Sequence, residues 1–134
     1  VTQPAPAHPS GEGITAAASL GEQRWQPWSA QRVAELSAAG QPVFIDFTAA
    51  WCVTCQYNKR TTLADAGLLA EFAARKVALL RADWTLRDPA ITAALTQLGR
   101  GGVPVYVLYA PGRAPVVFTE ILSVQEVRTA LQAL

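Results

Sequence analysis

The sequence contains few residues that could cross-link it or hold a metal, because its 134 residues include only two cysteines and one histidine. A structural zinc site normally needs four ligands, so these residues disfavour one. Two cysteines are also too few for a disulfide scaffold, and the loop between Cys52 and Cys55 is too short to restrict the unfolded chain much. A purely structural disulfide and two unrelated buried thiols remain alternatives, but the pair favours a chemical role.

An excess of one charge and a long apolar run are missing as well. Eleven lysines and arginines stand against ten aspartates and glutamates, and the basic residues are scattered. Without a basic stripe, nucleic acid is not an expected partner. The longest apolar runs, residues 43–53 and 103–110, are interrupted by Asp46 and Pro104 and fall short of the roughly 18–20 residues that span a bilayer. We therefore expect a soluble piece, monomeric in isolation, with no nucleic-acid or metal partner and no cofactor.

Residues 1–23 have the composition of a linker. They contain Pro4, Pro6 and Pro9, several glycines and a run of small residues. Such a segment cannot bury enough apolar surface to offset the entropy cost of ordering. The only histidine, His8, falls here and is expected to be solvated. The chain begins with Val1, so either a leader has been removed or the sequence is a piece of a longer protein, and we expect the second. We expect a flexible linker over residues 1–23 and one domain over residues 24–134.

The domain region predicts alternating helices and strands. Local signals mark the helix starts: Ser29, Asp65 and Asp88 can cap helices, and Ser123 with Glu126 can form a capping box. The expected helices are 30–39, 52–63, 66–76, 89–99 and 124–131, and the expected strands are 43–48, 77–82, 105–109 and 116–119. A helical crossover makes the first two strands parallel, and a hairpin adds two antiparallel ones. The pattern predicts an α/β fold with a mixed, four-stranded sheet.

The cysteine pair lies where a strand passes into a helix. A helix that starts at Cys52 places this sulfur among unpaired backbone N–H groups at the positive end of the helix dipole. That setting favours the thiolate, which is the attacking species. Cys55 lies one turn further on, close enough to attack a mixed disulfide formed by Cys52. We therefore expect Cys52 to be the nucleophile and Cys55 the resolving thiol, with Trp51 packed beside the pair.

Asp46 stands out because it interrupts an apolar strand six residues before Cys52. Buried beneath the pair, this carboxyl would have a raised pKa and could take the proton that Cys55 must lose. The alternative is an acid at the strand end that faces solvent or pairs with a lysine.

Val103 and Pro104 follow a glycine-rich loop and precede a strand. A cis peptide bond between them would bring backbone polar groups beside the cysteines, where these groups could bind an extended substrate.

These residues together resemble the thioredoxin superfamily, and more narrowly the C-terminal periplasmic domain of the membrane reductase DsbD and its relative ScsB. The resemblance extends from about Trp25 to Leu134. It is carried by the stretches Val43-Phe44-Ile45-Asp46-Phe47-Thr48-Ala49-Ala50-Trp51-Cys52-Val53-Thr54-Cys55, Ala82-Asp83-Trp84-Thr85 and Gly102-Val103-Pro104. It implies a thioredoxin fold with Cys52 and Cys55 as the redox pair, Asp46 as the buried acid and Pro104 as a cis-proline.

The resemblance also implies a direction of electron flow. In that family a membrane domain receives electrons from a cytoplasmic thioredoxin, and the C-terminal domain passes them to periplasmic thiol domains through transient mixed disulfides. The expected activity is therefore a protein-disulfide reductase on the periplasmic side of the bacterial inner membrane. One position departs from the pattern, because some DsbD domains carry an acid one turn after the second cysteine, where this chain has Lys59. Lys59 would favour a thiolate if it reaches the pair.

Two other functions compete with the reductase. A periplasmic oxidase or isomerase would use the same cysteines at a higher reduction potential. A binding module would use the fold with an idle pair. Any exchange mechanism predicts a partly apolar docking face around Trp51, Cys52 and residues 102–104, with Trp51, Val103 and Pro104 contacting the substrate.

Overall fold

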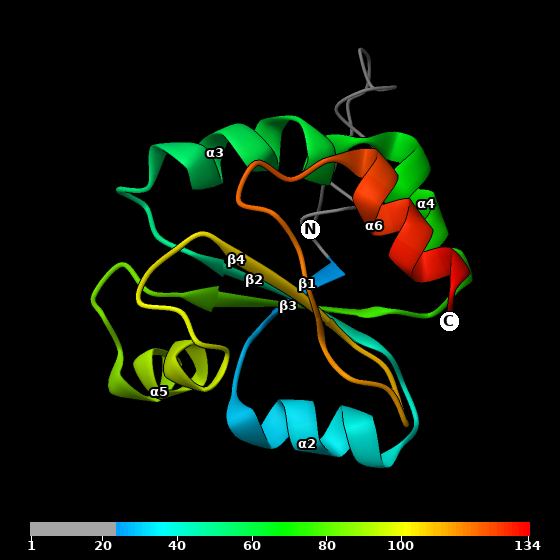
Figure 1. The fold of residues 1–134 in the computed structure, drawn as a ribbon, viewed down its shortest axis with the longest axis horizontal. Helices are drawn as coiled ribbons and strands as arrows, with labels where there is room; N and C mark the ends of the chain where they lie inside the picture. Colours follow the sequence, from blue (N-terminus) through cyan, green and yellow to red (C-terminus); the bar gives the residue numbers. More distant parts are fainter. Residues whose placement is uncertain (1–23) are drawn as a thin grey trace, which may run out of the picture.

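A mixed sheet of five strands, in the order β1-β3-β2-β4-β5, organises the residues that the computed structural model describes, 24–134 (Figure 1). The strands are β1 (Trp25–Pro27), β2 (Val43–Thr48), β3 (Ala78–Asp83), β4 (Val105–Tyr109) and β5 (Val116–Val117). β1 and β2 both pair with β3 in parallel, while β4 runs antiparallel to β2 and to β5. The tether and His8 expected over residues 1–23 lie outside the described residues.

The predicted sheet had four strands, and β1 is the addition. It is three residues long and ends at Pro27, whose ring removes a backbone donor. A segment this short shows no alternation of apolar and polar residues in the sequence. Its register beside β3, with Trp25 opposite Leu79, is a tertiary contact at the edge of the sheet. The sequence pattern therefore could not reveal it.

The helices begin where their capping residues predict. The four expected capping side chains, Ser29, Asp65, Asp88 and Ser123, each accept a hydrogen bond from a backbone N–H of the following turn, and the capping box is complete. The helices are α2 (Ala30–Ala38), α3 (Val53–Arg60), α4 (Ala66–Ala74), α5 (Pro89–Gln97) and α6 (Val124–Gln132). The helix expected over 52–63 is divided, because α3 ends at Arg60 and a short 3₁₀ turn, η1 (Thr62–Ala64), follows.

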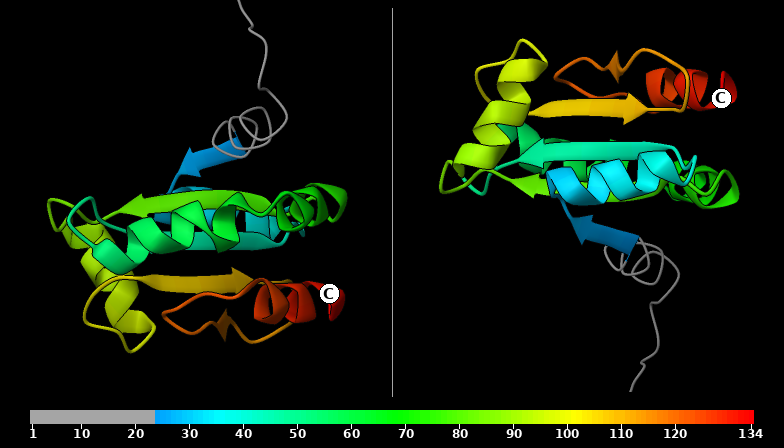
Figure 2. Two further views of the ribbon diagram at one scale, coloured as in Figure 1. Left: turned by 90° about the horizontal axis from the view of Figure 1, so that it is seen from above. Right: turned by 90° about the horizontal axis from the view of Figure 1, so that it is seen from below.

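The two faces of the sheet carry separate cores. In Figures 1 and 2, α3, α4 and α6 cover one face and α2 and α5 the other. Alternate residues of β2 point to the two sides: Phe44 belongs to the first core, while Ile45 and Phe47 belong to the second. By the same alternation Asp46 points to the side of α3. The pleat thus places this acid under the helix that carries the cysteines.

The end of β2 that leads into α3 is also where β3 ends and β4 begins, because β2 is parallel to β3 and antiparallel to β4. Loops from three strands therefore meet at the amino end of α3.

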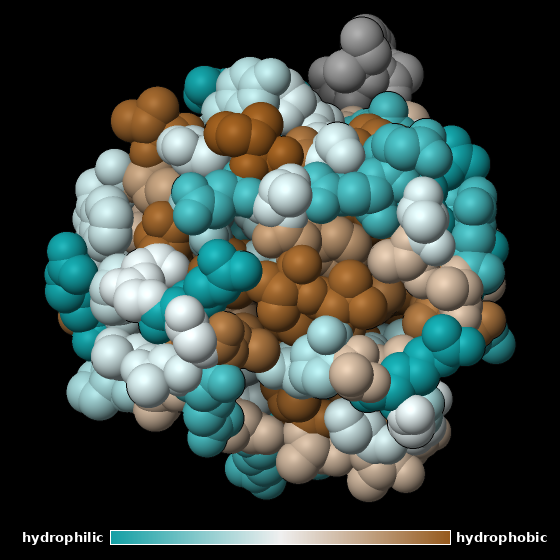
Figure 3. Space-filling view, in the orientation of Figure 1, coloured by the Kyte–Doolittle hydropathy of each residue, from teal (hydrophilic) through white to brown (hydrophobic). Residues whose placement is uncertain are grey.

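A separate apolar hollow of about 370 Å³ lies at the other end of β4, lined by residues of β4, β5 and α6. Figure 3 shows hydrophobic residues gathered in the middle of one face of the molecule. Within residues 24–134, no helix is long and apolar enough to cross a membrane.

Candidate active site

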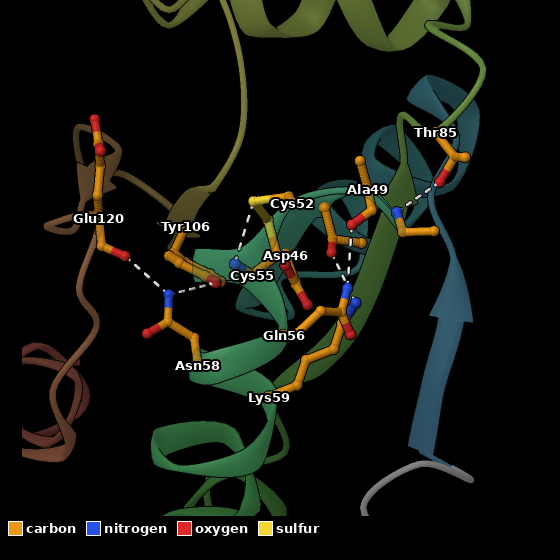
Figure 4. The surroundings of a disulfide bond; sticks show 12 residues. Asp46, Ala49, Cys52, Cys55, Gln56, Asn58, Lys59, Thr85, Tyr106 and Glu120 are labelled. Carbon is orange, nitrogen blue, oxygen red and sulfur yellow. Dashed lines mark hydrogen bonds between the residues drawn. A yellow bond between two sulfur atoms is a disulfide. The ribbon is translucent and has the colours of Figure 1, made fainter.

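Cys52 and Cys55 are joined by a disulfide at the amino end of α3, with their Cα atoms 5.2 Å apart (Figure 4). Cys52 is the N-cap residue, and its sulfur accepts a hydrogen bond from the backbone N–H of Cys55 at 3.2 Å. Cys52 is 7% exposed, whereas Cys55 is fully buried. The structure therefore brings the two sulfurs together and leaves the leading one nearer to solvent. Two unrelated thiols are excluded.

Asp46 is fully buried in β2, among the residues that surround the disulfide (Figure 4). Its Oδ2 accepts a hydrogen bond from Nε of Arg81 at 3.0 Å, and the two side chains form an ion pair. Arg81 lies directly opposite Asp46 in the parallel register of β2 and β3. The burial agrees with the expectation from sequence, and the carboxylate pairs with an arginine from the neighbouring strand.

Arg81 was not expected from the sequence. The sequence marks it in the same way as Asp46, because Arg81 is a charged residue inside the apolar run of residues 77–82. Two opposite charges in adjacent buried strands suggest an ion pair, but only the register between the strands brings them opposite each other.

Lys59 lies on α3 and contacts the end of the sheet. Its Nζ donates a hydrogen bond to Oγ1 of Thr48 at 2.7 Å. Both residues line a polar cavity of about 260 Å³, together with Ala50, Gln56, Arg81 and Asp83. Hydrogen bonds from Thr85 lower the pKa of Asp83, and the positive charge of Lys59 adds to this effect. The lysine therefore places its charge among polar groups at the end of the sheet that carries the disulfide.

A second polar network connects α3 to β4 and to the segment before α6. Asn58 is fully buried and donates hydrogen bonds to the hydroxyl of Tyr106 and to the carbonyl of Glu120, both at 2.8 Å (Figure 4). Its Oδ1 accepts a bond from the N–H of Leu122 at 3.2 Å. Burial, and then the negative charge of Asp46, raise the pKa of Tyr106, so the phenol stays protonated. A polar residue inside a helix was the only sequence signal for Asn58.

The peptide bond between Val103 and Pro104 is cis, as expected. Val103 packs against the small cluster that Ala49 forms with Cys52 and Cys55. Pro104 is buried and leads directly into β4. The loop before β4 therefore lies against the cysteine pair, which is where an extended substrate was expected to bind.

Trp51 is 49% exposed and is held by the loop that follows β3. Its indole N–H donates to the carbonyl of Thr85 at 3.1 Å, and the N–H of Ala50 donates to Oγ1 of Thr85 at 2.8 Å. The ring of Trp51 also lies 6.1 Å from that of Trp84. Among the apolar residues near the pair, Val53 is 81% exposed. Trp51 thus forms part of an accessible surface beside Cys52.

The structure thus places a disulfide at the start of a helix that packs on one face of a mixed sheet, with a cis-proline loop against the disulfide. A family model described as thioredoxin-like matches residues 24–111, more than half of the chain. The chain belongs to the thioredoxin-like family.

Within that family the chain is similar to DsbD proteins. It is 36% identical over 80 residues to thiol:disulfide interchange protein DsbD 1 of Pseudomonas aeruginosa and 38% identical over 88 residues to DsbD of Ralstonia nicotianae. These stretches are 60% and 64% of this chain but only 13% and 14% of the relatives, so the chain spans about one seventh of their length.

Solved structures agree on the fold. The oxidised C-terminal domain of DsbD from Neisseria meningitidis superposes with a TM-score of 0.65 at 18% identity, covering 80% of this chain and 96% of that one. A thioredoxin from Thermus thermophilus gives 0.64 at 21% identity, with 82% and 85% covered. The disulfide together with the DsbD relatives supports a thiol–disulfide oxidoreductase.

Proposed function

We propose that this domain relays electrons in the reductase direction, from the membrane domain of a larger protein to thiol proteins of the periplasm. The observation that carries the proposal is the Cys52–Cys55 disulfide at the amino end of α3, with Cys52 the more exposed sulfur. The similarity to thiol:disulfide interchange proteins supports the same chemistry. Residues 1–23 would be the tether to the inner membrane, and the isolated domain would be a monomer.

The exchange proceeds in two balanced steps. The thiolate of reduced Cys52 attacks a disulfide of the partner, so a bond forms between the two proteins and one partner sulfur leaves as a thiolate. Cys55, once deprotonated, attacks Cys52, which forms the internal disulfide and releases the second partner sulfur. Two electrons pass to the partner, whose sulfurs take up the two protons that the cysteines lost. The membrane domain would then reduce the Cys52–Cys55 disulfide again by the reverse sequence.

The positions of the surrounding residues support the following roles for them in these steps. Asp46 is buried near the pair and would accept the proton of Cys55, while Arg81 holds its carboxylate in place. Lys59 would favour thiolate at the site through its positive charge. Trp51, Val103 and Pro104 would contact the partner segment, since Trp51 is half exposed and the loop before β4 lies against the pair.

A Cys55→Ser variant tests the relay. Without the resolving thiol, the first step still occurs but the mixed disulfide through Cys52 cannot be released by the second. We expect the variant to accumulate covalent complexes with periplasmic proteins, detected on non-reducing gels. The matched Cys52→Ser variant should trap far less, because Cys55 is fully buried. Failure of Cys55→Ser to trap any partner in a periplasmic extract would contradict the relay.

The reduction potential separates the reductase from an oxidase or isomerase. Thioredoxin-like proteins span roughly −270 to −120 mV, with reductases at the low end. We expect a value near the low end when the full chain is equilibrated with glutathione or dithiothreitol buffers. A value near the top of that range would favour an oxidase. Full activity in cells after both cysteines are changed to alanine would favour a binding module.

A further inference from the structure

The loop between β3 and α5 is attached to the active-site loop at several points. Thr85 binds the backbone of Ala50 and the indole of Trp51, and its own N–H and hydroxyl both donate to Oδ1 of Asp83. The turn closes where the N–H of Arg87 donates to the carbonyl of Trp84 at 2.9 Å. These bonds fix the backbone of the turn beside Trp51.

Arg87 is the cation on this turn. Its guanidinium carbon lies 4.7 Å from the ring centre of Trp84 and 5.0 Å from that of Trp51, so one charge contacts both aromatic rings. The residue is exposed and has a positive φ of 55°, a conformation that non-glycine residues adopt uncommonly. Contact with aromatic faces holds a guanidinium without using the N–H groups at its edge.

Those N–H groups have no acceptor among residues 24–134, where the side chain of Arg87 makes neither a hydrogen bond nor an ion pair. The two neighbouring carboxylates are engaged elsewhere. Asp83 accepts from Thr85, and Asp88 accepts from the N–H of Ala90 as the cap of α5. A held guanidinium with unused donors is suited to bind a carboxylate in a bidentate manner.

We propose that Arg87 is a specificity-determining residue, which selects thiol partners that carry a carboxylate next to their reactive disulfide. This inference rests on the proposed exchange function. Leu86 at the tip of the turn is 92% exposed and Val53 is 81% exposed, so both can offer apolar contacts to a partner. Apolar contact gives little discrimination between partners, whereas a fixed charge favours encounter with an acidic segment and disfavours a basic one.

Three small symmetrical disulfides test this without a known partner. Glutathione disulfide carries carboxylates and a net negative charge, hydroxyethyl disulfide is neutral, and cystamine is positive. The second-order rate constants of the reduced full chain with each probe are measured by stopped flow. Ratios between probes cancel any change in the intrinsic reactivity of Cys52. For Arg87→Gln we expect the ratio of glutathione disulfide to cystamine to fall about twofold to fivefold, the range expected for an exposed ion pair. The difference should shrink at high salt.

Two further variants distinguish charge at this site from charge in general. Arg113→Gln removes the same charge from an exposed turn after β4, next to the apolar hollow, and should leave the ratio unchanged. Arg87→Lys keeps the charge but loses the planar donors, so it should recover only part of the selectivity. An unchanged ratio in Arg87→Gln, or an equal shift in Arg113→Gln, would overturn the inference while leaving the exchange function intact. A reduced wild-type chain that reacts with none of the three probes would overturn both.

Discussion

At the scale of single residues, charged side chains lie between the sheet and α3, near the disulfide. The buried carboxylate of Asp46 is paired with Arg81, and Lys59 reaches Thr48 two residues further along β2. A buried charge without a partner is costly, so Asp46 is stabilised in its buried position by its ion pair with Arg81. In the structure, Arg81 of the neighbouring strand forms an ion pair with Asp46.

Lys59 should tune the leading cysteine. Removing its positive charge in Lys59→Gln destabilises the thiolate, so the pKa of Cys52 should rise and the reduction potential should fall. The pH dependence of alkylation of Cys52 by iodoacetamide measures the first effect, and glutathione equilibration measures the second. Lys76→Gln is the matched control, because Lys76 is exposed after α4. If wild type and Lys59→Gln had the same Cys52 pKa and the same reduction potential, Lys59 would have no role in tuning the cysteine.

At the scale of elements, α3 is positioned by side chains near both of its ends. Cys52 caps its start, and near its end Asn58 binds Tyr106 and the segment before α6. Thr62 adds a bond from its hydroxyl to the carbonyl of Leu122 at 2.6 Å. This tertiary contact accompanies the change from α3 to a 3₁₀ turn, which the helical pattern of residues 52–63 did not show. The cysteines are thus presented by a short, well-anchored helix.

α6 should contribute a pH-dependent part of the stability. Burial raises the pKa of Glu126, but hydrogen bonds from Thr119 and Ser123 outweigh it, so the pKa lies below its ordinary value of 4.5. A carboxyl whose pKa is depressed on folding stabilises the native state above its unfolded pKa and loses this effect as the pH falls through its folded pKa. We expect Glu126→Gln to have a lower free energy of unfolding than wild type at pH 7. The difference between the two free energies should shrink below about pH 4.5. Urea unfolding at several pH values measures this, and a constant gap would contradict it.

At the scale of the whole molecule, the two faces of the sheet differ in polarity, and the buried titratable groups lie on one of them. The core under α2 and α5 consists of apolar residues, whereas the face under α3 also carries Asp46 and Tyr106. The polar cavity at the end of the sheet adjoins the face that α3 covers. The asymmetry places the titratable groups on the side of the disulfide.

The domain should fold and react without its first 23 residues. The described fold starts at Arg24, whose guanidinium donates to the carbonyl of Val77 at 3.0 Å, followed by β1. We expect a chain of residues 24–134 to match the full chain in thermal midpoint and in its rate with hydroxyethyl disulfide. Circular dichroism and stopped-flow kinetics check this. A large loss of either would show that residues 1–23 belong to the domain.

What the sequence by itself determined about this protein is local. Capping residues mark where helices begin, because a cap bonds to an N–H only two or three residues away. Apolar runs mark β2, β3 and β4, and the spacing of Cys52 and Cys55 across one helical turn predicts that their sulfurs can meet.

Only the tertiary structure decided which distant residues meet. The pairing of Asp46 with Arg81 depends on the register of two strands that are 35 residues apart in sequence. The contact of Arg87 with Trp51 depends on how the loop after β3 folds over the active-site loop. Such contacts have no periodic signal, because they arise from the packing of whole elements and not from the conformation of neighbouring residues.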